Sequence, residues 1–392
     1  MVNGSGVALE SGFGYAVCMK ELIWLEISKE ALANNIRQFR KMVGEDVVLA
    51  PCVKANAYGH GLVGTAKVFL EAGADWLCVD KLFEARILRE AGIESPIYVM
   101  GYVGLDDLEE LAKLDLRMVV YNEETVERLD ENGLAVKVQL KVETGNNRQG
   151  LENEELLSLA KKIEASDCVE LEGAATHFAN IEDTTDHSYA ETQIERFERQ
   201  VEMLSENGIE VKMRHCANSA ATMLFKETHM EMVRPGIASY GMWPSNETYV
   251  SYLKEVGNDF KLSPALSWKT RVAQVKDVAA GEYIGYGCTY RTSHDAKLAI
   301  LPVGYYNGYD RGIKGGHVLI KGQRAPIRGR ICMNIMMVEI TDIEGVKLED
   351  EVTLIGRDGD EEISMETFAD WAGTINYEVP ARINENISRK FI

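Results

Sequence analysis

A single lysine, Lys54, stands between a short apolar run and a turn rich in glycine. The run at 47–53 is Val-Val-Leu-Ala-Pro-Cys-Val, and the turn at 54–61 is Lys-Ala-Asn-Ala-Tyr-Gly-His-Gly. A short run with β-branched residues, followed by turn residues, predicts a buried strand rather than a helix. An amine that leaves water at the end of such a strand is more readily neutral, and a neutral amine can attack an aldehyde to form a Schiff base. We therefore expect Lys54 to be buried and reactive, although a lysine at a strand end more often extends into solvent.

The same turn contains three glycines, Gly59, Gly61 and Gly64, at the spacing of a dinucleotide-binding loop. That loop requires its first glycine directly after the strand and an acidic residue at the end of the next strand. Here residues 54–58 lie between the strand and the first glycine. The match therefore does not support a dinucleotide site.

The segment at 53–61 resembles the lysine motif of alanine racemases, which bind pyridoxal 5'-phosphate through that lysine. Further segments resemble the same family and extend the resemblance from about Leu25 to about Pro380. These segments are Lys141–Arg148, Cys216–Ala221, Val233–Ile237, Tyr286–Tyr290, Gly329–Met333 and Ile375–Glu378. The resemblance implies a cytoplasmic, pyridoxal-phosphate-dependent isomerase that interconverts L- and D-alanine, a peptidoglycan precursor, and that works as a homodimer with shared active sites.

The resemblance assigns a set of residues to the cofactor, most of them to its phosphate group. Small residues and glycine allow backbone N–H groups to approach a phosphate closely. Ser219 has a second interpretation as the N-cap of the following helix, and both roles can hold at once. Besides Lys54, the assigned residues are Tyr58, Arg148, Asn218, Ser219, Arg234, Gly236, Ile237 and Tyr377.

Two arginines and a second lysine receive roles from the same resemblance. Arg234 is implied to face the pyridine nitrogen of the cofactor. An arginine accepts no proton and leaves that nitrogen unprotonated, whereas an acid there would make the ring a stronger electron sink. Arg148 is implied to bind the cofactor phenolate and the substrate, and Lys141, a carbamate in some relatives, to hold Arg148. Without the resemblance, either arginine would be assigned to a surface ion pair.

Racemisation needs an acid/base group on each face of a planar intermediate, and Lys54 can serve only one face. The resemblance supplies the second group as Tyr286 of the other subunit. A tyrosine hydroxyl is a weak acid and must be activated to act as a base near neutral pH. His177 and, beyond it, Arg234 are implied to activate it. On its own, His177 would be interpreted as a hydrogen-bonded core histidine.

The residues expected on the substrate side differ from the family at several positions. Tyr305 and Met333 are implied to line the substrate pocket, but Asn307 and Asn334 stand where the family usually has Asp. Glu143 likewise replaces a usual Asp. These changes bear on which amino acid is bound more than on the reaction. A racemase of serine or of a larger amino acid, such as lysine or ornithine, is therefore an alternative.

Two further classes compete with a racemase. A decarboxylase of the same two-domain plan would present a cysteine and often an acid at the positions where this chain has Tyr286 and Arg234. A non-catalytic cofactor-binding protein would need only the barrel, and the tyrosines of residues 262–392 argue against it. Both alternatives are less favoured than the racemase.

Short apolar runs alternate with helical segments through the first part of the chain, after a helix that we expect to begin at Ser28, a good N-cap. Eight such runs with helices between them, for example at 84–92 and 191–204, favour a (β/α)8 TIM barrel over an open sheet. The runs lie near 47–53, 75–79, 96–100, 116–120, 136–142, 169–176, 210–215 and 230–233.

Active sites of such barrels lie at the carboxyl ends of the strands. Lys54, Arg148, His177, Ser219 and Arg234 each follow one of the predicted strands, the first, fifth, sixth, seventh and eighth. Hydrophobicity alone indicates these strands, so this placement is partly independent of the family resemblance.

From about residue 262 the pattern changes to strand after strand, with turns rich in Gly and Asp and one helix near 365–372. This pattern predicts a second, mostly antiparallel β domain. We expect an extension at 1–19, a barrel that binds pyridoxal phosphate at 20–255 and the β domain at 256–392, with a strand near 21–27 as a candidate member of the latter. The predicted strands lie at 265–278, 297–303, 317–321, 325–332, 336–340 and 351–355.

Composition excludes several classes of protein. The 392 residues carry a formal net charge of −20, which argues against nucleic acid or an anionic membrane as a partner. Seven scattered cysteines without a Cys-x-x-Cys pair suggest neither a disulfide framework nor a zinc site and fit a reducing cytosol. An enzyme acting on a small amino acid remains.

Overall fold

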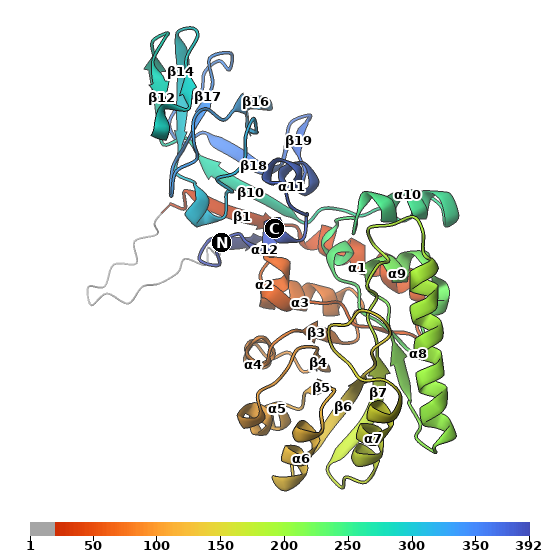
Figure 1. The fold of residues 1–392 in the computed structure, drawn as a ribbon. Coiled ribbons are helices and arrows are strands. Elements are labelled where there is room, and N and C mark those ends of the chain that lie inside the picture. The colour runs from red at the N-terminus through yellow and green to blue at the C-terminus, as the bar shows by residue number, and fades with distance from the viewer. Residues whose placement is uncertain (1–19) are drawn as a thin grey trace, which may run out of the picture. The chain divides into compact units, whose positions relative to one another are not determined.

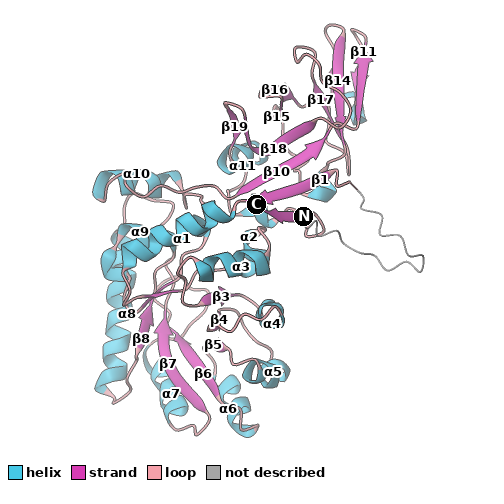
Figure 2. Cartoon of the chain, turned by 180° about the vertical axis from the view of Figure 1, so that it is seen from behind, coloured by secondary structure: helices cyan, strands magenta, loops and turns pink. Residues whose placement is uncertain are grey.

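The computed structural model describes residues 20–392, so the extension predicted at 1–19 lies outside the described residues. The described chain forms two compact units (Figures 1 and 2). The barrel unit contains residues 27–266, 376–382 and 391–392. The β unit contains residues 20–26, 267–375 and 383–390. Within residues 20–392, no helix is both long enough and apolar enough to cross a membrane.

Parallel strands form the centre of the barrel unit and are visible from behind in Figure 2. Six of them, β3 to β8, pair in sequence order, and β2 pairs with β9. Hydrogen bonds join the two groups: Val53 N donates to Cys78 O at 2.8 Å, and Glu231 N donates to Arg214 O at 3.3 Å. The predicted barrel is therefore confirmed, with its eight strands among the described residues. They are β2 (Val48–Leu49), β3 (Leu77–Val79), β4 (Ile97–Val99), β5 (Arg117–Val120), β6 (Val136–Lys141), β7 (Val169–Ala175), β8 (Met213–His215) and β9 (Met232–Val233).

Helices alternate with these strands and cover the barrel (Figure 1). The first begins where predicted, because Ser28 Oγ accepts a hydrogen bond from Ala31 N at 3.2 Å, and it buries Leu32, Ile36 and Phe39. The helices of this unit are α1 (Lys29–Val43), α2 (Lys54–Tyr58), α3 (Leu62–Glu71), α4 (Leu82–Glu90), α5 (Leu108–Lys113), α6 (Glu123–Glu131), α7 (Asn153–Glu164), α8 (Ser188–Glu206), α9 (Ser219–Leu224), α10 (Asn246–Glu255) and α12 (Glu378–Ala381).

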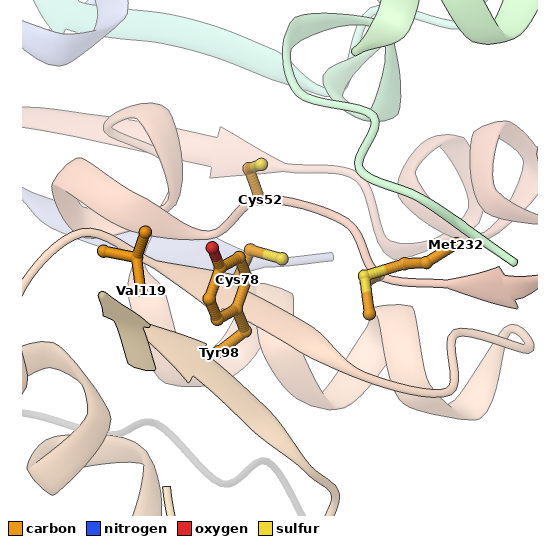
Figure 3. Packing of buried hydrophobic residues seen from close by; sticks show 6 residues of the cluster. Cys52, Cys78, Tyr98, Val119 and Met232 are labelled. Atoms are coloured by element: carbon orange, nitrogen blue, oxygen red, sulfur yellow. The ribbon is translucent and has the colours of Figure 1, made fainter. Parts of the chain in front are cut away.

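Buried side chains of β3, β4, β5 and β9, together with Cys52 after β2, fill part of the interior of the barrel. Figure 3 shows Cys52, Cys78, Tyr98, Val119 and Met232, which are buried together. Neighbouring strands contribute residues of different size, with Cys78 from β3, Tyr98 from β4 and Val119 from β5. Cys52, Tyr98 and Val119 also line the cavity described below, so this cluster closes one side of it.

The β unit contains a seven-stranded sheet in the order β16-β15-β18-β10-β1-β20, with β19 paired to β18, and a three-stranded sheet β11-β14-β17. Pairs such as β10–β18 and β11–β14 are antiparallel, as predicted. The β unit also contains the helix α11 (Met365–Ala372), whose N-cap is Ser364. Its strands are β1 (Ile23–Ile27), β10 (Leu266–Arg271), β11 (Gln274–Val278), β12 (Tyr283–Ile284), β13 (Tyr290–Arg291), β14 (Ala296–Leu301), β15 (His317–Ile320), β16 (Gln323–Pro326), β17 (Met336–Glu339), β18 (Glu351–Asp358), β19 (Glu361–Ile363) and β20 (Ser388–Phe391).

Two strand predictions in this unit are wrong. The run predicted at 325–332 is a strand only at its start, because β16 ends at Pro326. The run at 265–278 is two strands, β10 and β11, in two different sheets. The chain changes partner between them, because Val272 N donates to Asp350 O at 2.9 Å whereas Ala273 N donates to Ile300 O at 2.8 Å. A continuous apolar pattern does not reveal such a change of partner.

Candidate active site

Lys54 begins a left-handed turn and does not end a long strand, which corrects the sequence prediction. Strand β2 ends at Leu49, and Lys54 is half-buried instead of buried. Ala55, Asn56 and Ala57 have φ values of 53°, 53° and 54°. Each non-glycine residue in this conformation costs roughly 1–2 kcal/mol. Strain of this kind persists only where surrounding contacts hold the backbone, and it is concentrated at functional sites.

Glu84 of α4 stabilises the left-handed turn through hydrogen bonds from backbone N–H groups. Its side chain is buried, and Oε1 accepts a hydrogen bond from Ala55 N at 2.6 Å. The other oxygen, Oε2, accepts from Asp80 N at 3.0 Å and from Lys81 N at 3.1 Å. The carboxylate therefore joins the turn to the loop after β3 and fixes the backbone from which the Lys54 side chain extends.

Gly59 ends the turn, and there is no space for a side chain at this position. Its φ is +81°, and a Cβ at this position would lie 1.9 Å from Pro380 O of α12. The turn thus packs directly on the late segment 376–382, which belongs to the barrel unit. This contact explains how Tyr377, more than three hundred residues after Lys54, comes to the same site.

A cavity of about 620 Å³ opens in the barrel unit beside this turn. Most of the site residues predicted from the sequence line this cavity. They follow the carboxyl ends of several strands, as in other barrel sites. The predicted residues that line it are Lys54, Tyr58, Lys141, Arg148, His177, Asn218, Ser219, Arg234, Gly236, Ile237 and Tyr377.

Ser219 and Gly236 form a narrow polar cradle at one side of the cavity. Ser219 Oγ accepts hydrogen bonds from Gly236 N at 2.8 Å and Ala238 N at 3.3 Å. The interpretation of Ser219 as a helix N-cap is wrong, because Asn218 caps α9 by accepting from Ala221 N at 3.0 Å. A Cβ on Gly236 would lie 2.6 Å from Tyr58 Oη. The cradle therefore has room for a ligand only because residue 236 is glycine.

Glu182 borders this cradle and was not singled out from the sequence. One carboxylate oxygen accepts from Tyr377 Oη at 2.8 Å and the other from Asn218 Nδ2 at 2.7 Å. Burial raises the pKa of Glu182, and burial together with the nearby Glu182 raises the pKa of Tyr377. Its position in the loop five residues after His177 was the only available signal.

Arg234 lies at the base of the cavity and is buried. Its Nη2 donates to Thr176 O at 3.0 Å, and its Nη1 contacts His215 Nδ1. Burial and the positive charge of Arg234 hold the pKa of His215 well below its usual value. The pKa of His177 is also strongly lowered, mainly by burial and further by the charges of Lys141 and Arg234. Both imidazoles are therefore neutral at pH 7.

Lys141 is buried in the same cavity, and its environment disfavours the ammonium form. Burial, followed by the charges of Arg234 and Arg148, lowers its pKa to about 7, while Glu143 acts in the opposite direction. Arg148 is solvent-exposed. An unmodified Lys141 would therefore repel Arg148 when charged, which does not agree with the role of holding it.

Three predicted residues belong to the β unit. Tyr286 is 68% exposed and lies in a short 3₁₀ turn between Gly285 and Gly287, both at φ 73°. Tyr305 N donates to Cys332 O at 3.0 Å, which brings Tyr305 beside Met333. The side chains of Tyr305 and Met333 are also exposed. The predicted site residues are thus divided between the two units.

Known proteins resemble the chain along most of its length. Residues 27–244 match the family model of the alanine racemase N-terminal domain, and residues 265–391 match that of the C-terminal domain. The chain is 41% identical over 375 residues to an alanine racemase of Methanococcus maripaludis, an alignment that covers 94% of this chain and 98% of that protein. The chain belongs to the alanine racemase family.

Other members of the alanine racemase family agree with this assignment. An alanine racemase of Desulforamulus reducens is 41% identical over 380 residues, with 95% of this chain and 100% of that protein covered. The crystal structure of a Bacillus anthracis alanine racemase with bound L-Ala-P superimposes with a TM-score of 0.88 at 38% identity and covers 94% of each chain. The family predicted from the sequence motifs is confirmed.

Proposed function

We propose that this chain interconverts L- and D-alanine with pyridoxal 5'-phosphate bound through Lys54. The observation that carries the proposal is the convergence of three features on one cavity: the Lys54 amine, the cradle of Ser219 and Gly236, and the buried Arg234. Membership in the alanine racemase family supports the choice of reaction.

The residues of the cavity fit the proposed cofactor. The Ser219 hydroxyl and the Gly236 N–H that donates to it suit a phosphate group, and the space beside them would be filled by any side chain at residue 236. Tyr58, Asn218, Ile237 and Tyr377 complete the set proposed to bind the cofactor. When bound, pyridoxal phosphate supplies an electron sink for negative charge at the substrate α-carbon.

Arg234 is proposed to lie against the ring nitrogen of the cofactor. The guanidinium is far too weak an acid to give up a proton, so it would donate a hydrogen bond to that nitrogen without protonating it, whereas a carboxylic acid could protonate it. Its contacts with Thr176 O and His215 Nδ1 fix its plane. An arginine at this position would supply no proton to the ring, which suits a reaction that only removes and replaces one proton.

Two groups of this protein are proposed to move the substrate α-proton. Lys54 removes or delivers it on one face, and Tyr286 of a second subunit does so on the other. Tyr286 is exposed in a turn between two glycines, which supports its insertion into the active site of a partner subunit. His177, whose pKa is lowered by burial and nearby cations, is neutral and able to accept a hydrogen bond from the tyrosine hydroxyl. The active form is accordingly a homodimer with shared sites.

Lys141 is proposed to carry a carbamate. Its pKa of about 7 leaves a substantial neutral fraction at physiological pH, and a neutral amine can attack CO₂ to form an N–C bond with loss of one proton. The product is an anion, so the repulsion between Lys141 and Arg148 becomes attraction. Arg148 is then held where it can bind the substrate, together with Tyr305 and Met333.

One assay tests the proposed function and its alternatives together. The purified protein, supplied with pyridoxal phosphate, is incubated with L-alanine, L-serine, L-lysine and L-ornithine, and the D-enantiomers are measured by chiral chromatography. We expect the highest kcat/KM for alanine. A preference for another amino acid would show that alanine is not the substrate and would point to Asn307 and Asn334 as the cause. Release of CO₂ without racemisation would indicate a decarboxylase.

A further inference from the structure

The turn that contains Tyr286 lies at the end of a small hairpin in the β unit. Among residues 20–392, its two strands, β12 and β13, pair only with each other and extend neither of the larger sheets of this unit. Ladder hydrogen bonds to a neighbouring strand therefore do not fix the hairpin. Its position depends instead on packing and on hydrogen bonds between side chains.

Strand β12 is attached to the rest of the β unit by close packing. Ile284 is buried, and a Cβ on Gly329 would lie 2.5 Å from Ile284 O. A Cβ on Gly285 would lie 2.8 Å from the terminal methyl group of Met337 in β17. The backbone on this side of the hairpin thus lies directly against its neighbours, with no space for a larger residue at either glycine.

Strand β13 is attached through a polar cluster around Glu339 of β17, whose side chain is buried. Glu339 Oε2 accepts a hydrogen bond from Arg328 Nε at 2.6 Å, and Oε1 lies 2.8 Å from Nε2 of His294, three residues after β13. The Arg328 guanidinium lies 4.8 Å from the centre of the Tyr290 ring, within the range of a cation–π contact. One carboxylate therefore reaches this arm of the hairpin twice, through His294 and through Arg328.

The Glu339 carboxylate is ionised at neutral pH. Burial acts to raise its pKa, but hydrogen bonds from Arg328, His294 and Thr341 lower it overall. An ionised carboxylate only accepts, and each of these three side chains can donate. Charge-assisted hydrogen bonds of this kind are stronger than neutral ones. Loss of the carboxylate would therefore release Arg328 and His294 from their common acceptor.

We infer that Glu339 is a positioning residue that fixes the hairpin β12–β13 within the β unit and thereby holds Tyr286 where it can move a proton. The consequence for racemisation rests on the proposed function, whereas the attachment of the hairpin does not. Glu339 acts through Arg328 and His294 on the arm that follows the turn. The packing of Ile284 holds the other arm, so the turn needs both attachments to keep one position.

The first test does not require activity. The backbone N–H groups of Gly281, Glu282 and Thr292 donate hydrogen bonds within the hairpin, so their hydrogen exchange in the full-length protein, followed by mass spectrometry, reports its opening. Glu339→Leu is apolar and removes both acceptor oxygens. Because a charge-assisted hydrogen bond is lost, we expect residues 281–292 to exchange roughly tenfold faster, while peptides of the barrel unit exchange as before.

Glu344→Leu is the matched control, because Glu344 lies five residues further along the chain, carries the same charge and is exposed. It should leave the exchange of residues 281–292 unchanged. If Glu339→Leu does not fold, Arg328→Gln is the second variant: its amide can still donate to Glu339 but carries no charge toward the Tyr290 ring, and exchange of the hairpin should again be faster. Unchanged exchange of residues 281–292 in the folded variant would overturn the inference.

Kinetics test the consequence for Tyr286. In an active racemase, Glu339→Leu should lower kcat between roughly tenfold and a hundredfold, the scale expected for a catalytic group displaced by up to about 1 Å. The affinity for pyridoxal phosphate should not change, because the residues proposed to bind it lie in the barrel unit. In D₂O, Lys54 and Tyr286 each exchange the α-proton on one face only. Glu339→Leu should therefore slow exchange for the same enantiomer as Tyr286→Phe does and spare the other.

The outcomes separate this inference from the proposed function. If the unmodified protein racemises no amino acid, the proposed function fails, while hydrogen exchange still decides whether Glu339 fixes the hairpin. If Glu339→Leu keeps full kcat although its hairpin exchanges faster, the role toward Tyr286 is contradicted. Equal slowing of α-proton exchange for both enantiomers would contradict it as well, because a general loss of structure would act on both faces.

Discussion

A methyl group added at Gly236 should remove much of the affinity for pyridoxal phosphate. The Cβ of Gly236→Ala would lie 2.6 Å from Tyr58 Oη and 4.0 Å from Ser219 Oγ, in the space that we assign to the phosphate. The methyl group should displace the phosphate from one charge-assisted hydrogen bond or two, each contributing about 1.5–3 kcal/mol. Since about 1.4 kcal/mol is a factor of ten, affinity should fall at least roughly tenfold and at most roughly 10⁴-fold.

The assay is titration of the dialysed protein with pyridoxal phosphate, followed by visible absorbance. Gly104→Ala is a suitable control, because residue 104 has φ −60° and the atom nearest to its added Cβ is the exposed Asp107 carboxylate at 3.1 Å. This control should bind like the unmodified protein. Unchanged affinity in Gly236→Ala would mean that the phosphate does not occupy the cradle.

Three further predictions concern the other parts of the site. Tyr286→Phe should keep the cofactor absorbance but lose racemisation in both directions, measured by chiral chromatography, whereas Tyr283→Phe, exposed nearby, should remain active. Carbamate on Lys141 should decrease as pH falls below about 7, because the amine becomes protonated and unreactive, and ¹³C NMR with labelled bicarbonate should show this loss; a pH-independent or absent signal would contradict it. Glu84→Gln should lower the free energy of unfolding by about 2 kcal/mol in urea, because an amide cannot accept from all three N–H groups around it. Glu90→Gln, exposed on the same helix, should have no comparable effect.

Much of the barrel could be predicted because its parallel strands are buried on both sides. Such strands appear as short continuous apolar runs, and eight of them separated by helices define the fold. The positions of Arg148, His177, Ser219 and Arg234 after particular strands followed from the same pattern. Periodicity also located α1, since Ser28 has both the residue type and the geometry of an N-cap.

The parts that could not be predicted depend on contacts between distant residues or on unusual backbone. Nothing in Ala55-Asn-Ala57 indicates a left-handed turn, because its cost is offset by Glu84, which is about thirty residues away. The contact between Glu182 and Tyr377 joins residues 195 positions apart.

The most direct test of the account is complementation between two inactive variants, Lys54→Ala and Tyr286→Phe. If each active site combines Lys54 of one subunit with Tyr286 of the other, a mixed dimer has one site with both defects and one intact site. Free exchange of subunits makes half of the dimers mixed, so activity should recover to roughly a quarter of the unmodified level, as the symmetry of a two-fold dimer requires. Mass spectrometry of differently tagged subunits confirms the exchange. No recovery after confirmed exchange would mean that Lys54 and Tyr286 do not meet across a subunit interface, and the shared-site racemase proposed above would be contradicted.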